Sequence, residues 1–170
     1  MPALDYVSIV RSVYSDRRAM LTAACGTALA AGLSAYKSQS VPLLLIALAF
    51  IGTGLLRFAV SRAFSRAAIE NDDSAGAEYW EHWAVFTGAL AGSVYGAWCF
   101  ISMVVVQDPF AEIASATLTT AAMVGLVARN FGLDRLLTIQ MVLVMVPMSL
   151  GYALHGDVYH IVLDLLLGGM

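Results

Sequence analysis

Charged residues are scarce in this sequence. Of its 170 residues only 12% are Asp, Glu, Lys or Arg, and 60% are hydrophobic, whereas soluble domains carry about 25% charged residues. The mean hydropathy is +0.79. A chain with so little charge cannot cover a water-exposed surface, so the composition argues against a soluble domain and predicts a membrane protein.

Cysteine and catalytic motifs are also scarce. The two cysteines, Cys25 and Cys99, lie in apolar segments with no CxxC pair and no neighbouring histidine, which supports neither a disulfide framework nor a zinc site. The sequence has no nucleotide-binding glycine loop, nucleophile elbow or HExxH motif, and its basic residues form no nucleic-acid-binding patch. We therefore expect no enzyme active site and no nucleic-acid partner, and no motif identifies a cofactor.

Long apolar runs fill most of the chain. Because a bilayer core of about 30 Å needs roughly 20 mostly apolar residues per helix, there is room for about six spans in antiparallel hairpins. We predict an all-α polytopic membrane protein with spans at about 19–36, 41–58, 80–106, 110–127, 136–154 and 158–170. Residues 1–18 precede them as an amphipathic segment at the membrane interface. The last run is short, so we expect its helix to continue beyond Met170 in a longer protein; a half-spanning end is the alternative.

Polar connections separate these runs. We expect turns at 37–40 and 107–109, a longer break at 71–76, and a connection at 128–135 in which Gly132 caps one helix and Asp134 begins the next. All the arginines fall on the side of the N-terminus and Lys37 falls on the other, so the N-terminus is predicted to be cytoplasmic. The arginines are Arg11, Arg17, Arg18, Arg57, Arg62, Arg66, Arg129 and Arg135.

Four ionisable residues gather at the start of the last apolar run: His155, Asp157, His160 and Asp164. An ionisable residue at the depth of Asp164 is costly in lipid, which makes it a functional-site hypothesis. With Asp108 and Glu112 of the neighbouring external turn, these residues could bind a cation or sense external pH. The alternative is a set of solvated loop residues, with Asp157 as a helix cap.

A second group, Glu78, Glu81 and His82, shares one helical face at i, i+3 and i+4 spacing. These side chains could form half a metal site or a proton sensor, although no particular metal is indicated. A simpler interpretation is an interfacial position, because the adjacent Tyr and Trp side chains belong at headgroup level and carboxylates favour a helix N-terminus.

Gly88, Gly92 and Gly96 recur at every fourth residue of the third predicted span. Such a seam of small residues lets another helix approach closely. It predicts either packing within one chain or the interface of a homodimer.

Three short stretches resemble the N-terminal six-helix membrane module of alphaproteobacterial GGDEF/EAL proteins: residues 10–18, 108–110 and 128–132. The resemblance implies a bacterial inner-membrane protein whose membrane module senses a signal or sets dimerisation. In such proteins a cytoplasmic GGDEF domain, the diguanylate cyclase, condenses two GTP into cyclic-di-GMP, and an EAL domain hydrolyses it. No GGDEF or EAL motif occurs in these 170 residues, so none of those catalytic residues is carried over.

These observations favour a sensory or anchoring module in the lipid bilayer, dimeric, that regulates a cytoplasmic signalling domain of the same longer protein. A rival interpretation is a small transporter or channel subunit, in which Asp164, His160 and the hydroxyls of the fourth span line a path. Those hydroxyls belong to Ser115, Thr117, Thr119 and Thr120. A purely structural membrane anchor is the third alternative.

Overall fold

Helices make up the described part of the chain. The computed structural model describes residues 3–15, 17–67, 69–70, 73–130 and 132–155. Within those residues the elements are α1 (Ala3–Ser15), α2 (Arg17–Ser38), α3 (Val41–Ala67), α4 (Ser74–Phe100), the π-helical segment η1 (Ile101–Val106), α5 (Pro109–Asn130) and α6 (Asp134–His155). No strand occurs among the residues described, so the predicted all-α class is confirmed for them.

Five segments are long and apolar enough to cross a bilayer: Arg17–Ser38, Val41–Ala67, Ser74–Val106, Pro109–Ala128 and Asp134–His155. Each contains one of the first five predicted spans, and the sixth, 158–170, lies outside the described residues. Large apolar side chains such as Leu29, Leu48 and Val124 are exposed on their outer faces, where lipid would meet them. The chain is a multi-pass membrane protein.

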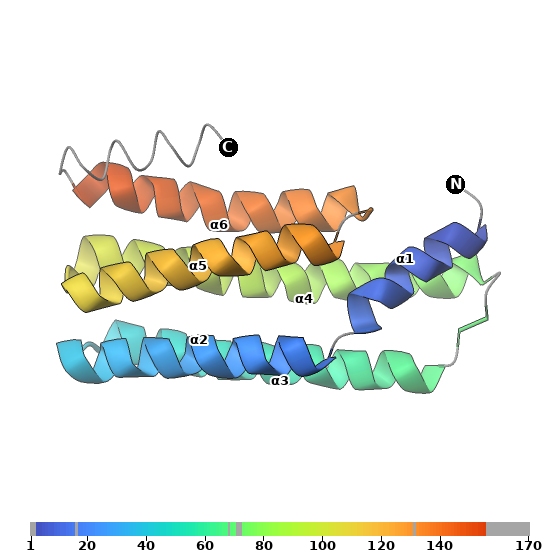
Figure 1. The fold of residues 1–170 in the computed structure, drawn as a ribbon, viewed down its shortest axis with the longest axis horizontal. Helices are drawn as coiled ribbons and strands as arrows, with labels where there is room; N and C mark the ends of the chain where they lie inside the picture. Colours follow the sequence, from blue (N-terminus) through green and yellow to red (C-terminus); the bar gives the residue numbers. More distant parts are fainter. Residues whose placement is uncertain (1–2, 16, 68, 71–72, 131, 156–170) are drawn as a thin grey trace.

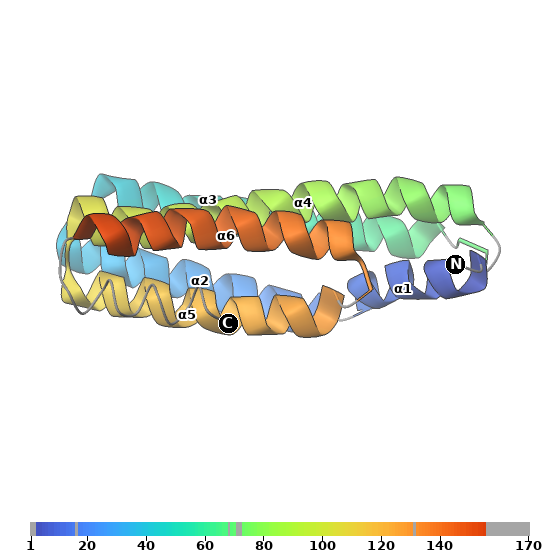
Figure 2. The same cartoon turned by 90° about the horizontal axis from the view of Figure 1, so that it is seen from above.

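The spans run side by side along one long axis. α2 and α3 form one layer of the bundle, α4 and α5 the next, and α6 covers the far side of α4 (Figures 1 and 2). α3 and α4 project beyond the other spans, and α1 lies across their projecting ends (Figure 1). We call this the α1 end of the bundle and the opposite one, which holds the connections after α2 and after η1, the turn end.

The projection follows from helix length. α3 has 27 residues, which makes it about 40 Å long, and the continuous α4–η1 segment has 33. Both exceed a bilayer core of about 30 Å. The predicted break at 71–76 is too long, because α4 begins at Ser74: the Asp73 carboxylate accepts a 2.8 Å hydrogen bond from the Gly76 N–H and caps the helix there.

Each of the two connections at the turn end contains one residue with a left-handed backbone conformation. Gln39 and Gln107 have φ of 52° and 53°, the left-handed conformation that ends a helix. The next N–H after Gln39, that of Ser40, donates to Ala35 O at 3.1 Å, and the Gln107 N–H donates to Ser102 O at 2.9 Å. The predicted turns at 37–40 and 107–109 are confirmed. Gly132, the predicted helix cap, has a left-handed φ of 105°, and α6 starts at Asp134 as predicted.

The apolar face of α1 packs on protein. Val7, Val10 and Val13 are buried in a cluster with Val60 of α3 and Leu136 of α6. Full burial of an aliphatic side chain contributes about 1.5–3 kcal/mol, so these contacts hold α1 firmly to the bundle. The amphipathic pattern read from the sequence therefore describes a helix docked on its own spans.

Tyr14 anchors the end of α1. Its ring stacks on Phe64 of α3 with the centroids 4.3 Å apart, and its hydroxyl donates to the backbone carbonyl of Trp80 in α4 at 2.7 Å. The Trp80 indole meets both rings edge-on, at 6.2 Å from Tyr14 and 5.5 Å from Phe64. Three aromatic side chains thus join α1, α3 and α4 at one point.

The glycine seam of α4 packs against α6 of the same chain. A Cβ added at Gly88 would lie 2.5 Å from Gln140 Nε2, and one at Gly96 would lie 2.3 Å from Leu143 O. Leu143 O also lies four residues before Pro147, which has no N–H to donate to it, so Gly96 admits a carbonyl that lacks its usual helical donor. Of the two interpretations of the seam, the structure displays packing within one chain.

We predict that Gly96→Ala destabilises the bundle whereas Gly52→Ala does not. The added methyl at Gly96 would meet Leu143 O, whereas nothing lies within 4 Å of one at Gly52. Overpacking of a tight contact costs about 1–3 kcal/mol, and Ala at an open helical site gains about 0.5–1 kcal/mol over Gly. Thermal unfolding of the two variants in the same mild detergent measures the difference; equal melting temperatures would contradict this account of the seam.

Candidate functional site

An ion pair at the turn end ties α2 to α5. Lys37 Nζ lies 3.1 Å from Asp108 Oδ2 and 5.4 Å from the centroid of the Phe110 ring. Asp108 also caps α5, since its Oδ1 accepts from the N–H groups of Phe110 and Ala111 at 3.0 and 3.1 Å. The hydrogen bond from Lys37, followed by that from Ala111, lowers the pKa of Asp108 below its ordinary 3.8.

His155 meets Glu112 beside this pair. His155 Nε2 of α6 lies 3.3 Å from Glu112 Oε1 of α5, and the two side chains are 20% and 15% exposed. The contact is an ion pair only when the imidazole is protonated. From the sequence we expect Glu112 to lie near His155 and the other ionisable residues of the last apolar run. Of those, Asp157, His160 and Asp164 lie outside the described residues.

The second predicted group lines a small cavity at the α1 end. Glu78, Glu81 and His82 of α4 enclose about 220 Å³ together with Tyr6 of α1 and Arg135 of α6. The Tyr6 hydroxyl donates to Glu81 Oε2, and His82 Nδ1 donates to the Glu78 carbonyl at 2.8 Å.

The electrostatics of this cavity hold Tyr6 neutral. Burial is the largest cause that raises the pKa of the Tyr6 phenol, and the hydrogen bond to Glu81 and the negative charge of that carboxylate add to it. The described residues contain no group of three or more His, Cys, Asp or Glu side chains placed to hold a metal ion. Residues of three helices thus line this cavity, and the hydrogen bond from Tyr6 to Glu81 joins α1 to α4 within it.

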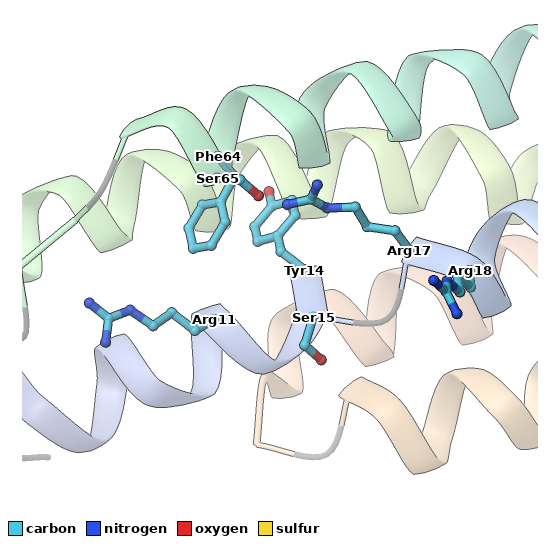
Figure 3. A pocket seen from close by; sticks show the side chains of 7 residues that line it. All are labelled: Arg11, Tyr14, Ser15, Arg17, Arg18, Phe64 and Ser65. Atoms are coloured by element: carbon cyan, nitrogen blue, oxygen red, sulfur yellow. The ribbon is translucent and has the colours of Figure 1, made fainter.

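Three arginines border a larger and more open pocket where α1 meets α2. Arg11, Arg17 and Arg18 line about 480 Å³ with Tyr14 and Phe64. Figure 3 shows Arg17 extended toward the stacked rings, Arg11 on the other side of them, and Arg18 at the start of α2. Arg11 donates to the carbonyl of Ile69. We call this the arginine pocket; its charge suits an anion.

The fourth-span hydroxyls fall on two faces of α5. Ser115 and Thr119 are fully buried, where the Cys99 thiol donates to Thr119 Oγ1 at 3.2 Å and to Ser115 O at 3.5 Å. Thr117 and Thr120 are exposed. The four hydroxyls therefore do not line one common path. The Thr119 hydroxyl accepts a hydrogen bond from α4, as interhelical acceptors do in lipid, whereas the Ser115 hydroxyl donates to the Glu112 carbonyl of its own helix at 3.0 Å.

α6 connects the two predicted groups. His155 ends it at the turn end, and Arg135, in its first turn, lines the Tyr6 cavity at the α1 end. Between these points α6 packs on the glycine seam of α4, which itself carries Glu81 and His82. Sequence reasoning missed the Lys37–Asp108 pair and the roles of Tyr6 and Arg135. Asp108 directly before Pro109 was the available signal for a helix cap.

The comparisons with known proteins add no relative. No protein-family model, curated protein or solved structure matches the chain.

We predict that the stabilising effect of Lys37 disappears in acid. Because the folded-state pKa of Asp108 is lowered, its contribution is present above the unfolded-state value and is lost as pH falls through the folded-state value. The stability difference between wild type and Lys37→Met should therefore be largest near pH 7 and vanish well below pH 3.8. Unfolding of both proteins in mild detergent at several pH values measures it, and a difference independent of pH would disprove the linkage.

We predict that Tyr6→Phe weakens the docking of α1. Loss of a hydrogen bond to a charged group costs about 1.5–3 kcal/mol. Because the folded-state pKa of Tyr6 is raised, the contribution is full below the ordinary value of 10.0 and is lost as pH rises through the folded-state value. Hydrogen exchange of α1 amides should quicken in Tyr6→Phe at pH 7 to 8. Tyr79→Phe, an exposed tyrosine on α4, is the matched control and should leave exchange unchanged.

Proposed function

We propose that this chain is a membrane-embedded sensory or anchoring module that responds to conditions at the turn end and regulates a signalling domain at the α1 end. The contact that carries this proposal is His155 with Glu112, at 3.3 Å between α6 and α5. Histidine changes charge within the physiological pH range, so acidification converts a hydrogen bond into an ion pair and favours helix arrangements that keep α5 and α6 together at that end.

In this proposal α6 transmits the conformational change from the turn end to the α1 end. A stimulus shifts an equilibrium only if it favours one arrangement over another, and a displacement of packed helices by 1–2 Å is a common form of such a change. The glycine seam is the contact across which such a displacement of α6 relative to α4 would occur. The same shift would move Arg135 relative to Glu81 and Tyr6 and so reach α1.

The output side of the proposal rests on resemblance. Residues 10–18, 108–110 and 128–132 are similar to the membrane modules of GGDEF/EAL proteins, which favours a diguanylate cyclase or a cyclic-di-GMP phosphodiesterase as the regulated domain and the bacterial inner membrane as the location. The arginine-rich end is the cytoplasmic one in this proposal. A homodimer is part of it as well, and because α6 covers the glycine seam, the second copy would contact another face.

We predict that His155→Gln and Glu112→Gln each abolish the response to external acid. The experiment measures cyclic-di-GMP in cells that express the full-length gene product, at external pH 8 and pH 5. Neither variant can form the ion pair, so cyclic-di-GMP should stay at its pH 8 level in both.

His82→Gln serves as the matched control, because it changes a histidine of the opposite end. It should leave the response intact. A response that survives in His155→Gln and is lost in His82→Gln would move the sensor to the α1 end. Two further predicted residues, His160 and Asp164, are exchanged for Leu in the same assay, and an unchanged response would remove them from the sensing site.

A further inference from the structure

A cavity of about 600 Å³ lies between α2, α3 and α5, with α4 behind it. Most of its lining residues are Ala or Gly, and α2 and α5 diverge toward the α1 end along it (Figure 1). Ala23 and Gly26 of α2, and Ala121 and Gly125 of α5, line it and are exposed. The cavity therefore opens sideways, where a membrane-embedded bundle meets lipid.

The dimensions of the cavity suit one hydrocarbon chain. Along α2 it extends from Ala19 to Thr27, which is about 12 Å of helix and close to the roughly 15 Å depth of one leaflet. Its volume falls within the range of about 300–1,000 Å³ that is typical of small-molecule sites. Its threonine hydroxyls, at Thr27 and Thr53, already donate to carbonyls of their own helices, at 2.9 Å in both cases, so the walls present a mostly apolar surface.

Positive charge gathers at the α1 end of this cavity. Arg57 lines it there. Arg17 and Arg18, which Figure 3 shows at the start of α2, border the arginine pocket and directly precede the lining residue Ala19 in the sequence. The carboxylates Glu78 and Glu81 line a different cavity, with Arg135. An occupant that fits both the apolar walls and this end has a hydrocarbon tail and an anionic head.

We propose that this cavity binds an acyl chain of one anionic phospholipid of the leaflet at the α1 end, with the phosphate of its headgroup toward Arg57, Arg17 and Arg18. A phospholipid fits because the cavity opens to the bilayer and reaches headgroup depth at the arginines. This lipid site is independent of the sensory role proposed above.

Native mass spectrometry of the chain in a neutral detergent tests this assignment with three probes: phosphatidylglycerol, phosphatidylcholine with the same acyl chains, and oleate. We expect one phosphatidylglycerol to bind more tightly than phosphatidylcholine. Arg57→Gln should reduce its affinity about fivefold, which is the contribution of one Arg near an anionic lipid surface, and Arg57→Lys should restore most of it.

Variants that fill the cavity provide a second test of lipid binding. Gly26→Leu and Gly125→Leu add bulk at two residues that line the cavity, where nothing lies within 4 Å of an added Cβ, and both should abolish phosphatidylglycerol binding. Gly32→Leu, on α2 outside the cavity and equally open at its Cβ, is the matched control and should bind as wild type does. Melting temperatures of all variants establish that each one is folded.

Equal binding of phosphatidylglycerol and phosphatidylcholine would overturn the proposal. It would also be overturned if the Gly26→Leu and Gly125→Leu variants bound phosphatidylglycerol as tightly as the Gly32→Leu control. Oleate binding without phosphatidylglycerol binding would overturn it too, in favour of a free fatty acid.

Discussion

The contact between α4 and α6 is the constraint on which the arrangement of this bundle depends. In lipid no hydrophobic force drives one helix against another, so helices associate through close packing and interhelical hydrogen bonds. Gly88, Gly92 and Gly96 remove the side chains that would keep α6 away, and Gln140 and Leu143 occupy the space. Once α6 lies in that position, His155 reaches Glu112 at one end and Arg135 joins the Tyr6 cavity at the other.

Most of the helix boundaries could be predicted because they depend on neighbouring residues. Apolar runs, left-handed turn positions and caps act over a few residues, and so the start of α6 at Asp134 and the turns around Gln39 and Gln107 follow from the sequence. The start of α4 was misjudged, since 71–76 contains several turn-forming residues. One cap, Asp73, is enough to begin the helix early, and local composition does not reveal which of several capping residues will be used.

The partners within the candidate site could be predicted only in part. The i, i+3, i+4 rule places Glu78, Glu81 and His82 on one face, but it does not say that Tyr6, 75 residues away from Glu81, donates to it. The pairing of Lys37 with Asp108 likewise depends on how α2 and α5 lie against each other. The glycine seam is ambiguous for a related reason, because a groove of small residues accepts a helix of the same chain or of a second copy equally well.

The π-helical segment also governs the position of charge at the turn end. An α-helix advances by about 100° per residue, and each turn of η1 holds more residues than an α-turn because its hydrogen bonds, such as that from Gln107 to Ser102, reach back five residues. The six residues from Ile101 to Val106 therefore change the angular phase of everything that follows. Deletion of one residue there would restore a regular α-helix and rotate Asp108 away from Lys37. The wide turn of η1 therefore sets the position at which the opposite charges of two separate hairpins meet.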